Sequence, residues 1–247
     1  MLTVNALFLL CVLSILLLCS GNVELNPGPG VVNFYKKLSM CHINIRSLSR
    51  SKLLAIKTSL SDTYDVITLS ETHLHPGVTN DLFILPGYHE IIRKDRTGQG
   101  GGVAIFIKEN VIFKRIFELE SASIEALWLQ VNTIQGKVLI CCCYRPPTDI
   151  EFWNNFDGIM EDAKARQARY IVVLGDLNAD FKTPNGNKLK ELCFIHNLNC
   201  LVNEPTRITA TSATVLDQIM TNAPNFVHSV CISPQCLLTI TVLYQSC

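Results

Sequence analysis

The sequence predicts an α/β protein in which packed β-sheets carry helices on their outer faces. The chain has 247 residues, of which 48% are hydrophobic and only 17% are charged. This composition supplies enough apolar material for a globular core and excludes a disordered tail protein. Short β-rich runs alternate with stretches of helical periodicity, and the expected strands outnumber the expected helices. That ratio favours packed sheets over a simple doubly wound sheet.

The first segment differs from the rest of the chain. Residues 1–23 carry no charged side chain, and residues 6–19 form an almost unbroken apolar run. The run has the length of a signal-peptide core, with Ser20 and Gly21 after it but no Lys or Arg before it, and it is short for a membrane span. A buried core helix is the alternative. If residues 1–20 act as a signal peptide, the chain enters the secretory pathway.

A linker follows, because residues 21–29 read GNVELNPGP and two prolines flank a glycine. Glu24 and residues 26–29 resemble the 2A-like ribosome-skipping peptide. The resemblance implies that the Gly28–Pro29 peptide bond is not formed. The leader would then be released, and the product beginning at Pro29 would remain in the cytoplasm or nucleus.

Expected elements of the body follow in order along the chain. The expected strands are residues 40–45, 66–69, 102–107, 126–131, 138–144, 170–174 and 215–220. The expected helices are residues 51–60, 149–168 and 188–196, where apolar residues recur at intervals of three and four. The glycine-rich residues 98–102 precede a strand rather than a helix, so we interpret them as a turn and not as a phosphate loop.

Cysteine usage indicates free thiols. The count of eleven is odd, and Cys141, Cys142 and Cys143 are consecutive, so their side chains alternate between the two faces of a strand. We expect most cysteines to be core residues of a protein from a reducing compartment. No CxxC pair accompanies a suitably spaced histidine pair, which argues against zinc.

The net charge of the chain does not indicate a particular class of binding partner. The 21 basic and 21 acidic side chains cancel, which excludes coating of nucleic acid by bulk charge but leaves a local basic groove open. The best local basic cluster is Arg93, Lys94 and Arg96. It is a candidate for contact with a DNA backbone, and a solvated surface is the alternative.

Polar side chains lie at the ends of several expected strands, and strand ends in a layered α/β protein converge on one rim. They are Asn44, Glu71, Asp176, Asn178 and Asp217. Carboxylate and amide oxygens gathered in this way suit Mg²⁺, which uses only one or two carboxylates directly. The alternative is that each residue starts a turn or caps a helix.

Six strings occur in a fixed order: CHINIRSL at 41–48, LSETHL at 69–74, GGGVA at 100–104, YRPP at 144–147, GDLN at 175–178 and LDQI at 216–219. Together they resemble the endonuclease/exonuclease/phosphatase superfamily. The likeness is greatest to the apurinic-type endonuclease domain that opens the reverse-transcriptase polyprotein of non-LTR retrotransposons (LINE elements), including the CR1-like group. The string EPTR at 204–207 adds to it, and the resemblance covers residues 37–230.

The resemblance implies a DNase I-like fold, a four-layer sandwich of two mostly antiparallel sheets flanked by helices. It implies Mg²⁺-dependent hydrolysis of a DNA phosphodiester, with Mn²⁺ as a substitute, to nick DNA for target-primed reverse transcription. The implied partners are DNA and the reverse transcriptase domain of the intact element, with no small-molecule cofactor. A phosphatase acting on phosphoinositides or nucleotides is the alternative within the superfamily.

The site residues follow from the same resemblance. Glu71 is the implied metal ligand, with Asn44 beside it. Tyr144 contacts the scissile phosphate, and Asp176 orients or deprotonates the attacking water. Asn178 supports that geometry, and Asp217 orients a later histidine. These roles suit phosphoryl transfer, which needs a cation, a positioned water and a base.

The chain departs from the family at its end, where members carry Ser-Asp-His and this sequence has no histidine after His228. If residues 237–240 are encoded CTT-CTG-ACC-AT, a shifted reading frame gives Ser-Asp-His. We therefore expect the last strand to be missing or non-native and residues 237–247 to be a poorly packed tail. The expected organisation is a leader with the 2A-like peptide at 1–29, a linker at 30–36, the catalytic domain at 37–236 and this tail. A catalytically dead remnant that at most binds DNA is the second alternative.

Overall fold

The computed structural model describes residues 37–96, 99–232 and 238–243. The leader, the linker and the Gly28–Pro29 bond of the predicted skipping peptide lie outside these residues. In the described part, no helix is both long enough and apolar enough to cross a membrane.

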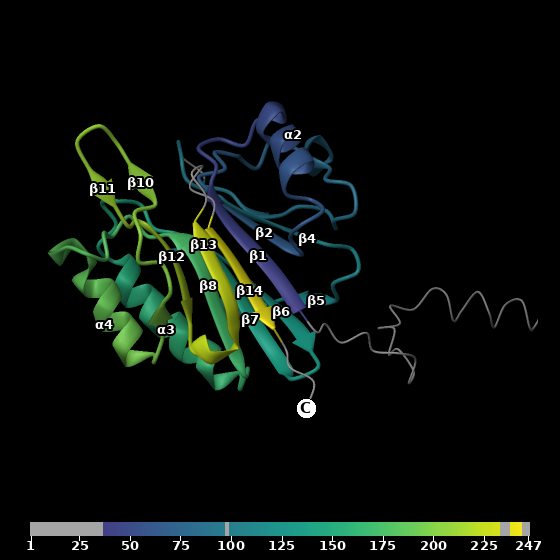
Figure 1. Cartoon of the computed structure of the whole chain (residues 1–247). Helices are drawn as coiled ribbons and strands as arrows, with labels where there is room; N and C mark the ends of the chain where they lie inside the picture. Colours follow the sequence, from purple (N-terminus) through teal and green to yellow (C-terminus); the bar gives the residue numbers. More distant parts are fainter. Residues whose placement is uncertain (1–36, 97–98, 233–237, 244–247) are drawn as a thin grey trace, which may run out of the picture. The chain divides into compact units, whose positions relative to one another are not determined.

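Two six-stranded sheets form the centre of the domain (Figure 1). The first contains, in spatial order, β13 (Val227–Ile232), β14 (Leu238–Leu243), β1 (Lys37–Asn44), β2 (Val66–Ser70), β4 (Val103–Ile107) and β3 (Ile92–Lys94). The second contains β5 (Phe113–Arg115), β6 (Glu125–Thr133), β7 (Gly136–Tyr144), β8 (Tyr170–Asp176), β12 (Asp217–Thr221) and β9 (Asn199–Cys200). The pairs β1–β2 and β7–β8 are parallel, and the other described neighbours in each sheet are antiparallel. The prediction of two mostly antiparallel sheets is confirmed.

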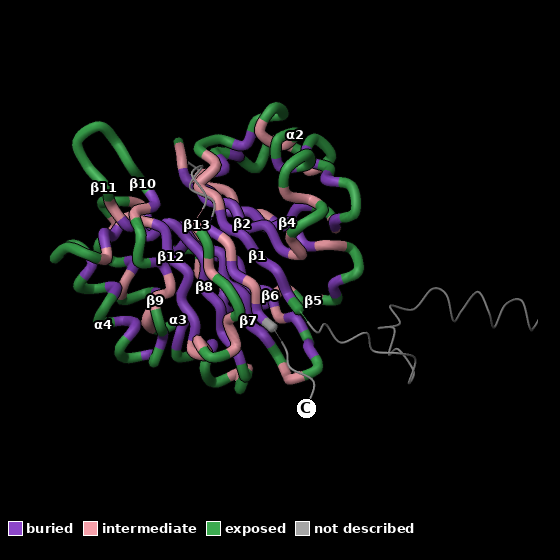
Figure 2. The backbone as a smooth tube through the Cα atoms, in the orientation of Figure 1, coloured by how far each residue is buried: buried purple, intermediate pink, exposed green. Residues whose placement is uncertain are grey.

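Three apolar clusters separate four layers. One lies between the two sheets. A second packs the second sheet against α3 (Phe152–Ala165) and α4 (Asn187–Ile195), and a third packs the first sheet against α2 (Arg50–Ser59). The central strands of each sheet are accordingly buried, whereas β13 at the edge of the first sheet is largely exposed and the helices expose one side (Figure 2). The four-layer sandwich predicted from the sequence is therefore the observed architecture.

The cysteine run on β7 follows the pleat of the strand. Cys142 packs into the cluster between the sheets, whereas Cys141 and Cys143 pack on the opposite face towards α3. All three are fully buried, and the seven cysteines of the described residues are free thiols. The expectation of free, mostly buried cysteines holds for this part of the chain.

The last strand differs from the sequence-based prediction that it is missing. β14 is present, and it pairs with both β13 and β1 in an antiparallel register. Leu238 and Ile240 are fully buried and Val242 is nearly so, because every second side chain of the strand faces the core between the sheets. The expectation of a missing strand is wrong, and residues 238–243 are not poorly packed. That the residues at this end are non-native stays a prediction. Residues 233–237 and 244–247 lie outside the described residues.

We expect Ile240→Ala to lower the free energy of unfolding by about 2–5 kcal/mol, the usual effect of emptying a buried isoleucine site. The matched control is Thr241→Ala, because Thr241 is half-buried and its neighbour on the strand; it should change stability by less than about 1 kcal/mol. Urea unfolding of the two variants checks this. Equal midpoints for Ile240→Ala and the parent chain would show that β14 does not contribute to the core.

Several short elements have no sequence signal. β3, β5, β9 and the hairpin of β10 (Arg207–Ile208) and β11 (Ala213–Thr214) each contain only two or three residues per strand, too few for a period to show. The predicted helix at 149–168 is shorter at both ends in the structure, where it spans Phe152–Ala165. Before its first residue, the Asp149 carboxylate accepts the Phe152 backbone N–H at 3.0 Å. The described residues also contain 3₁₀ segments, namely η1 (Asn80–Phe83), η2 (Phe117–Leu119), η3 (Pro184–Gly186) and η4 (Pro224–Phe226).

Candidate active site

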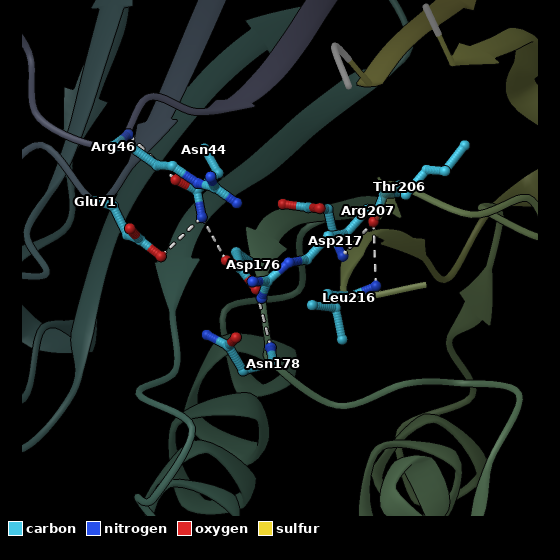
Figure 3. Close-up of a pocket in the computed structure, with 10 residues that line it drawn as sticks. Asn44, Arg46, Glu71, Asp176, Asn178, Thr206, Arg207, Leu216 and Asp217 are labelled. Carbon is cyan, nitrogen blue, oxygen red and sulfur yellow. Dashed lines mark hydrogen bonds between the residues drawn. The ribbon is translucent and has the colours of Figure 1, made fainter. Parts of the chain in front are cut away.

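Strand ends from both sheets meet at one edge of the sandwich. Asn44 is the last residue of β1, Glu71 directly follows β2, and Asp176 is the last residue of β8. Asp217 begins β12 and pairs in register with Asp176. Together with Asn178 they line one cavity of about 320 Å³ (Figure 3). The structure thus brings together the five polar residues that the sequence analysis placed at strand ends.

A single amide joins the two sheets at this edge. The Asn44 Nδ2 group donates to Glu71 Oε1 at 2.8 Å and to Asp176 Oδ2 at 2.6 Å. The Asn178 backbone N–H donates to the other oxygen of Asp176 at 3.0 Å. The Asn178 side chain is fixed in turn, because its Nδ2 donates to the Arg145 backbone carbonyl at 2.9 Å. Both carboxylates are therefore held in defined orientations.

The backbone around the cavity adopts conformations that side chains usually avoid. Arg46, Glu71 and Asn178 have φ values of 44°, 53° and 46°. Residues with side chains seldom occupy this left-handed region, and such strain concentrates at functional sites. The segment after Glu71 is held by the backbone N–H groups of residues 72 and 73, which donate to the carbonyls of Gly102 and Gly101.

Gly175 explains how Asp176 comes close to the neighbouring strand. A Cβ at Gly175 would lie 2.2 Å from the Cys143 carbonyl oxygen, so only glycine allows β7 and β8 to approach here. The next residues, Tyr144 and Asp176, are paired in register. Burial, followed by the charges of Glu71 and Asp176, raises the pKa of Tyr144 to about 12. The phenol therefore stays protonated at neutral pH and can donate a hydrogen bond.

The two aspartates differ in charge state. Burial is the main cause that raises the pKa of Asp217 to about 8, and the neighbouring charge of Asp176 adds to it. Burial also raises the pKa of Asp176, but hydrogen bonds from Asn178 and Asn44 oppose the effect and leave it at about 6. Near pH 7, Asp217 therefore keeps its proton while most Asp176 is ionised. Two carboxyl groups with separated pKa values are typical of acid–base sites.

A histidine that the sequence analysis did not single out lies beneath Asp217. His42 is fully buried, and burial lowers its pKa to about 3, so the ring is neutral. Its Nδ1 atom lies 3.0 Å from Thr68 Oγ1, and its Nε2 atom lies 4.0 Å from Asp217 Oδ1. That Asp217 oxygen is buried without a hydrogen-bond partner in the described residues. The available signal was the spacing of two from Asn44, which puts both side chains on one face of β1.

We expect Asp217→Asn to stabilise the protein at pH 8 but not at pH 4. Because the folded pKa lies above the ordinary value of 3.8, the unfolded chain loses this proton first, and folded stability declines from about pH 4 to about pH 8. The asparagine side chain does not titrate. The variant should therefore melt on the order of 10 °C above the parent at pH 8.

Thermal unfolding at the two pH values measures this difference. The control is Asp81→Asn, an exposed carboxylate on η1, which should shift the melting temperature equally at both pH values. A pH-independent effect of Asp217→Asn would show that Asp217 is not a protonated buried acid.

The predicted basic cluster does not form a single exposed patch. Arg93 pairs with Asp95 at 3.5 Å and donates to the Val78 carbonyl. Lys94 donates to the Ser121 carbonyl. Arg96 pairs with Glu125, and its guanidinium lies 5.7 Å above the Tyr144 ring. These internal contacts occupy many of the hydrogen-bond donors of the three side chains. The role of Arg93, Lys94 and Arg96 in binding DNA stays a prediction.

Further residues line the cavity that the sequence analysis did not select: Arg46, Thr206, Arg207, Ile208 and Leu216. A signal was present for most of them, because they lie within or next to the strings at 41–48, 204–207 and 216–219. Their role was hidden because the sequence does not show which loops face the cavity.

The cavity suits a hard divalent cation in the type of its donors. The described residues contain no cluster of three or more His, Cys, Asp or Glu side chains that could bind a metal. Mg²⁺ does not need one, since it keeps several waters and binds one or two carboxylates directly. Glu71 has 21% of its side chain exposed at the cavity, and the Asp176 carboxylate lines the same space. These two residues could hold the ion.

Two packed mixed sheets, with a carboxylate and amide pocket at their common edge, define a DNase I-like α/β sandwich. Residues 41–237 match the model of the Endonuclease/Exonuclease/phosphatase family. The chain belongs to that family. No curated protein matches it.

Solved structures share the fold at low sequence identity. The endonuclease domain of TRAS1, a telomere-specific non-LTR retrotransposon, is 12% identical with a TM-score of 0.67, and the match covers 85% of this chain and 100% of that one. The catalytic domain of Xenopus laevis APE2 is 15% identical with a TM-score of 0.64, covering 85% and 94%. An AP endonuclease from Archaeoglobus fulgidus is 13% identical with a TM-score of 0.59, covering 85% and 100%.

Proposed function

We propose that this protein is a Mg²⁺-dependent DNA endonuclease that hydrolyses one phosphodiester bond. The observation that carries the proposal is the Asn44 amide, which joins Glu71 and Asp176 at the edge of a cavity. Family membership favours a hydrolase of phosphate esters. DNA is favoured as the substrate because structures with the same fold include an AP endonuclease and the endonuclease domain of a retrotransposon.

Each residue has a role that its surroundings support. Glu71 and Asp176 would hold Mg²⁺, which supplies positive charge against the charge that develops on the phosphate. Asp176 orients the attacking water and accepts its proton, which suits a carboxyl group that is mostly ionised near neutral pH. Tyr144 would donate a hydrogen bond from its phenol O–H to a phosphate oxygen and would keep its proton. Asn178 holds Asp176 in position through its backbone N–H.

In the retrotransposon setting, the nick leaves a 3′-hydroxyl that primes a reverse transcriptase encoded by the same element. The strings at 144–147 and 204–207 favour this setting over a phosphatase of the same family. The 2A-like leader, which would release the product at Pro29, belongs to the same proposal.

The test is nicking of supercoiled plasmid in Mg²⁺. The parent chain should convert supercoiled plasmid to open circles, and EDTA should stop the reaction. Glu71→Ala should lose it as well. If Glu71→Ala nicks as fast as the parent chain, the assigned site is wrong.

A second candidate is an inactive remnant that binds DNA without cutting it. One observation favours it: no histidine is among the residues lining the cavity in the described part of the chain. Plasmid nicking separates the two, because the remnant would retard DNA in a gel but leave supercoiled plasmid intact in Mg²⁺.

A further inference from the structure

Two arginines line the same cavity as the carboxylates. Arg46 lies just beyond β1, and Arg207 lies in β10 on the other side of the cavity (Figure 3). Within the described residues, neither guanidinium makes a hydrogen bond or an ion pair. Because a guanidinium carries five N–H donors in a fixed fork that matches phosphate oxygens, both side chains have donors available for an anionic ligand.

The backbone at Arg207 is held in place by its neighbours. It pairs with Thr214 across the β10–β11 hairpin. The preceding residue, Thr206, is buried, and its hydroxyl oxygen accepts the backbone N–H groups of Leu216 and Asp217, each at 3.1 Å. The base of the hairpin is thereby attached to β12 beside the cavity. The Arg207 side chain is exposed, so a substitution there should leave the fold intact.

The positive charge of Arg207 acts on the cavity. It lowers the pKa of Asp176 and so counteracts part of the rise that burial causes. The cavity contains three carboxyl groups, of which Asp217 keeps its proton near neutral pH. Among the described lining residues, the two guanidiniums carry the positive charge.

We propose that Arg207 contacts the scissile phosphate of a bound DNA strand and stabilises the charge developing on its oxygens, while Arg46 contacts the same phosphate from across the cavity. The inference rests on the proposed function and adds to it a charged group that the sequence analysis did not assign. A guanidinium cannot act as a general base at neutral pH, so its contribution is electrostatic.

Nicking kinetics test the catalytic part. Arg207→Gln should lower kcat by about 10²-fold, the usual effect of removing one donor to a developing negative charge. Arg207→Lys keeps the charge without the fork and should recover part of the loss. The matched control is Arg166→Gln, which removes an arginine paired with Glu118 outside the cavity and should leave kcat unchanged.

DNA binding tests the contact separately from chemistry. Fluorescence anisotropy of a labelled duplex in EDTA, at several salt concentrations, gives the slope of log Kd against log salt. Arg207→Gln should reduce that slope by about one, the change expected for one lost phosphate contact, and Arg166→Gln should not change it.

The two assays distinguish the possible failures. If the parent chain does not nick DNA but Arg207→Gln still reduces the salt slope, the endonuclease function fails and the phosphate contact stands. If the parent nicks DNA and Arg207→Gln matches Arg166→Gln in both assays, the Arg207 proposal is overturned while the function stands. A reduced slope with unchanged kcat supports the contact and overturns the stabilisation of developing charge.

Discussion

Asp176→Asn is expected to lower the plasmid-nicking rate by about 10²- to 10⁴-fold, the usual contribution of a general base. Asparagine has nearly the same shape as aspartate and can still accept the Asn178 backbone N–H through its oxygen. It cannot accept a proton from water at neutral pH. Initial rates of open-circle formation measure the effect, and thermal unfolding checks that the fold is retained.

The matched control is Asp180→Asn. Asp180 is also buried, and its Oδ1 atom accepts backbone N–H groups from Lys182 and Val215. It lies four residues beyond Asp176 but does not line the cavity, so its substitution should leave the nicking rate unchanged. Equal losses from the two variants would indicate a general effect of removing a buried charge, and the role assigned to Asp176 would then be wrong.

The pH dependence gives a second measurement of the same role. Because the pKa of Asp176 is about 6, the base is increasingly protonated as the pH falls below that value. The nicking rate of the parent chain should therefore fall towards acid, be about half-maximal near pH 6 and level off above about pH 7. A rate that is flat between pH 5 and pH 7 would contradict Asp176 as the base.

Much of the fold follows from the sequence because the long strands carry a clear pattern. β7 and β8 are runs of apolar residues buried on both faces, and such runs can be read without a partner. The polar residues at strand ends could be assigned to one edge because strand ends in a layered α/β protein converge on one rim. Asn44 ends β1 in the first sheet and Asp176 ends β8 in the second. Asn44 Nδ2 accordingly lies 2.6 Å from Asp176 Oδ2, although 132 residues separate the two in sequence.

Other features required the three-dimensional arrangement. β14 was misjudged because the absence of one motif led to the expectation of a missing strand, although the alternating pattern LTITVL at 238–243 is typical of a half-buried strand. Arg93, Lys94 and Arg96 were grouped because they are close in sequence. Arg93 and Lys94 are neighbours on β3 and point to opposite faces of the sheet, and Arg96 lies beyond the strand, so the three have different partners. His42 and Arg207 were overlooked because their importance depends on which distant residues they meet.

Restoring a histidine is expected to raise the nicking rate by about 10²- to 10⁴-fold. β14 begins opposite His42, two residues from Asn44, so the entry to this strand lies at the edge that carries the cavity. Asp217 Oδ1 is buried there without a hydrogen-bond partner in the described residues. A histidine entering at this point could donate to that oxygen, and leaving the oxygen unpaired is costly.

The variant for this experiment replaces the residues after Val230 with the shifted-frame reading of the genomic locus that contains Ser-Asp-His. Its control is the same replacement with alanine in place of the histidine, which should nick no faster than the parent. Asp217→Asn in the restored chain should cancel most of the gain, because the histidine would lose the carboxylate that orients it.

Sequencing of the locus comes first. Codons that cannot encode Ser-Asp-His in any frame would remove the frameshift hypothesis and leave the inactive remnant as the better account. If the frame is recovered but the restored chain gains no activity, Asp217 does not act through a restored histidine. His42, whose Nε2 atom lies 4.0 Å from Asp217 Oδ1, is then the neighbour to examine by substitution.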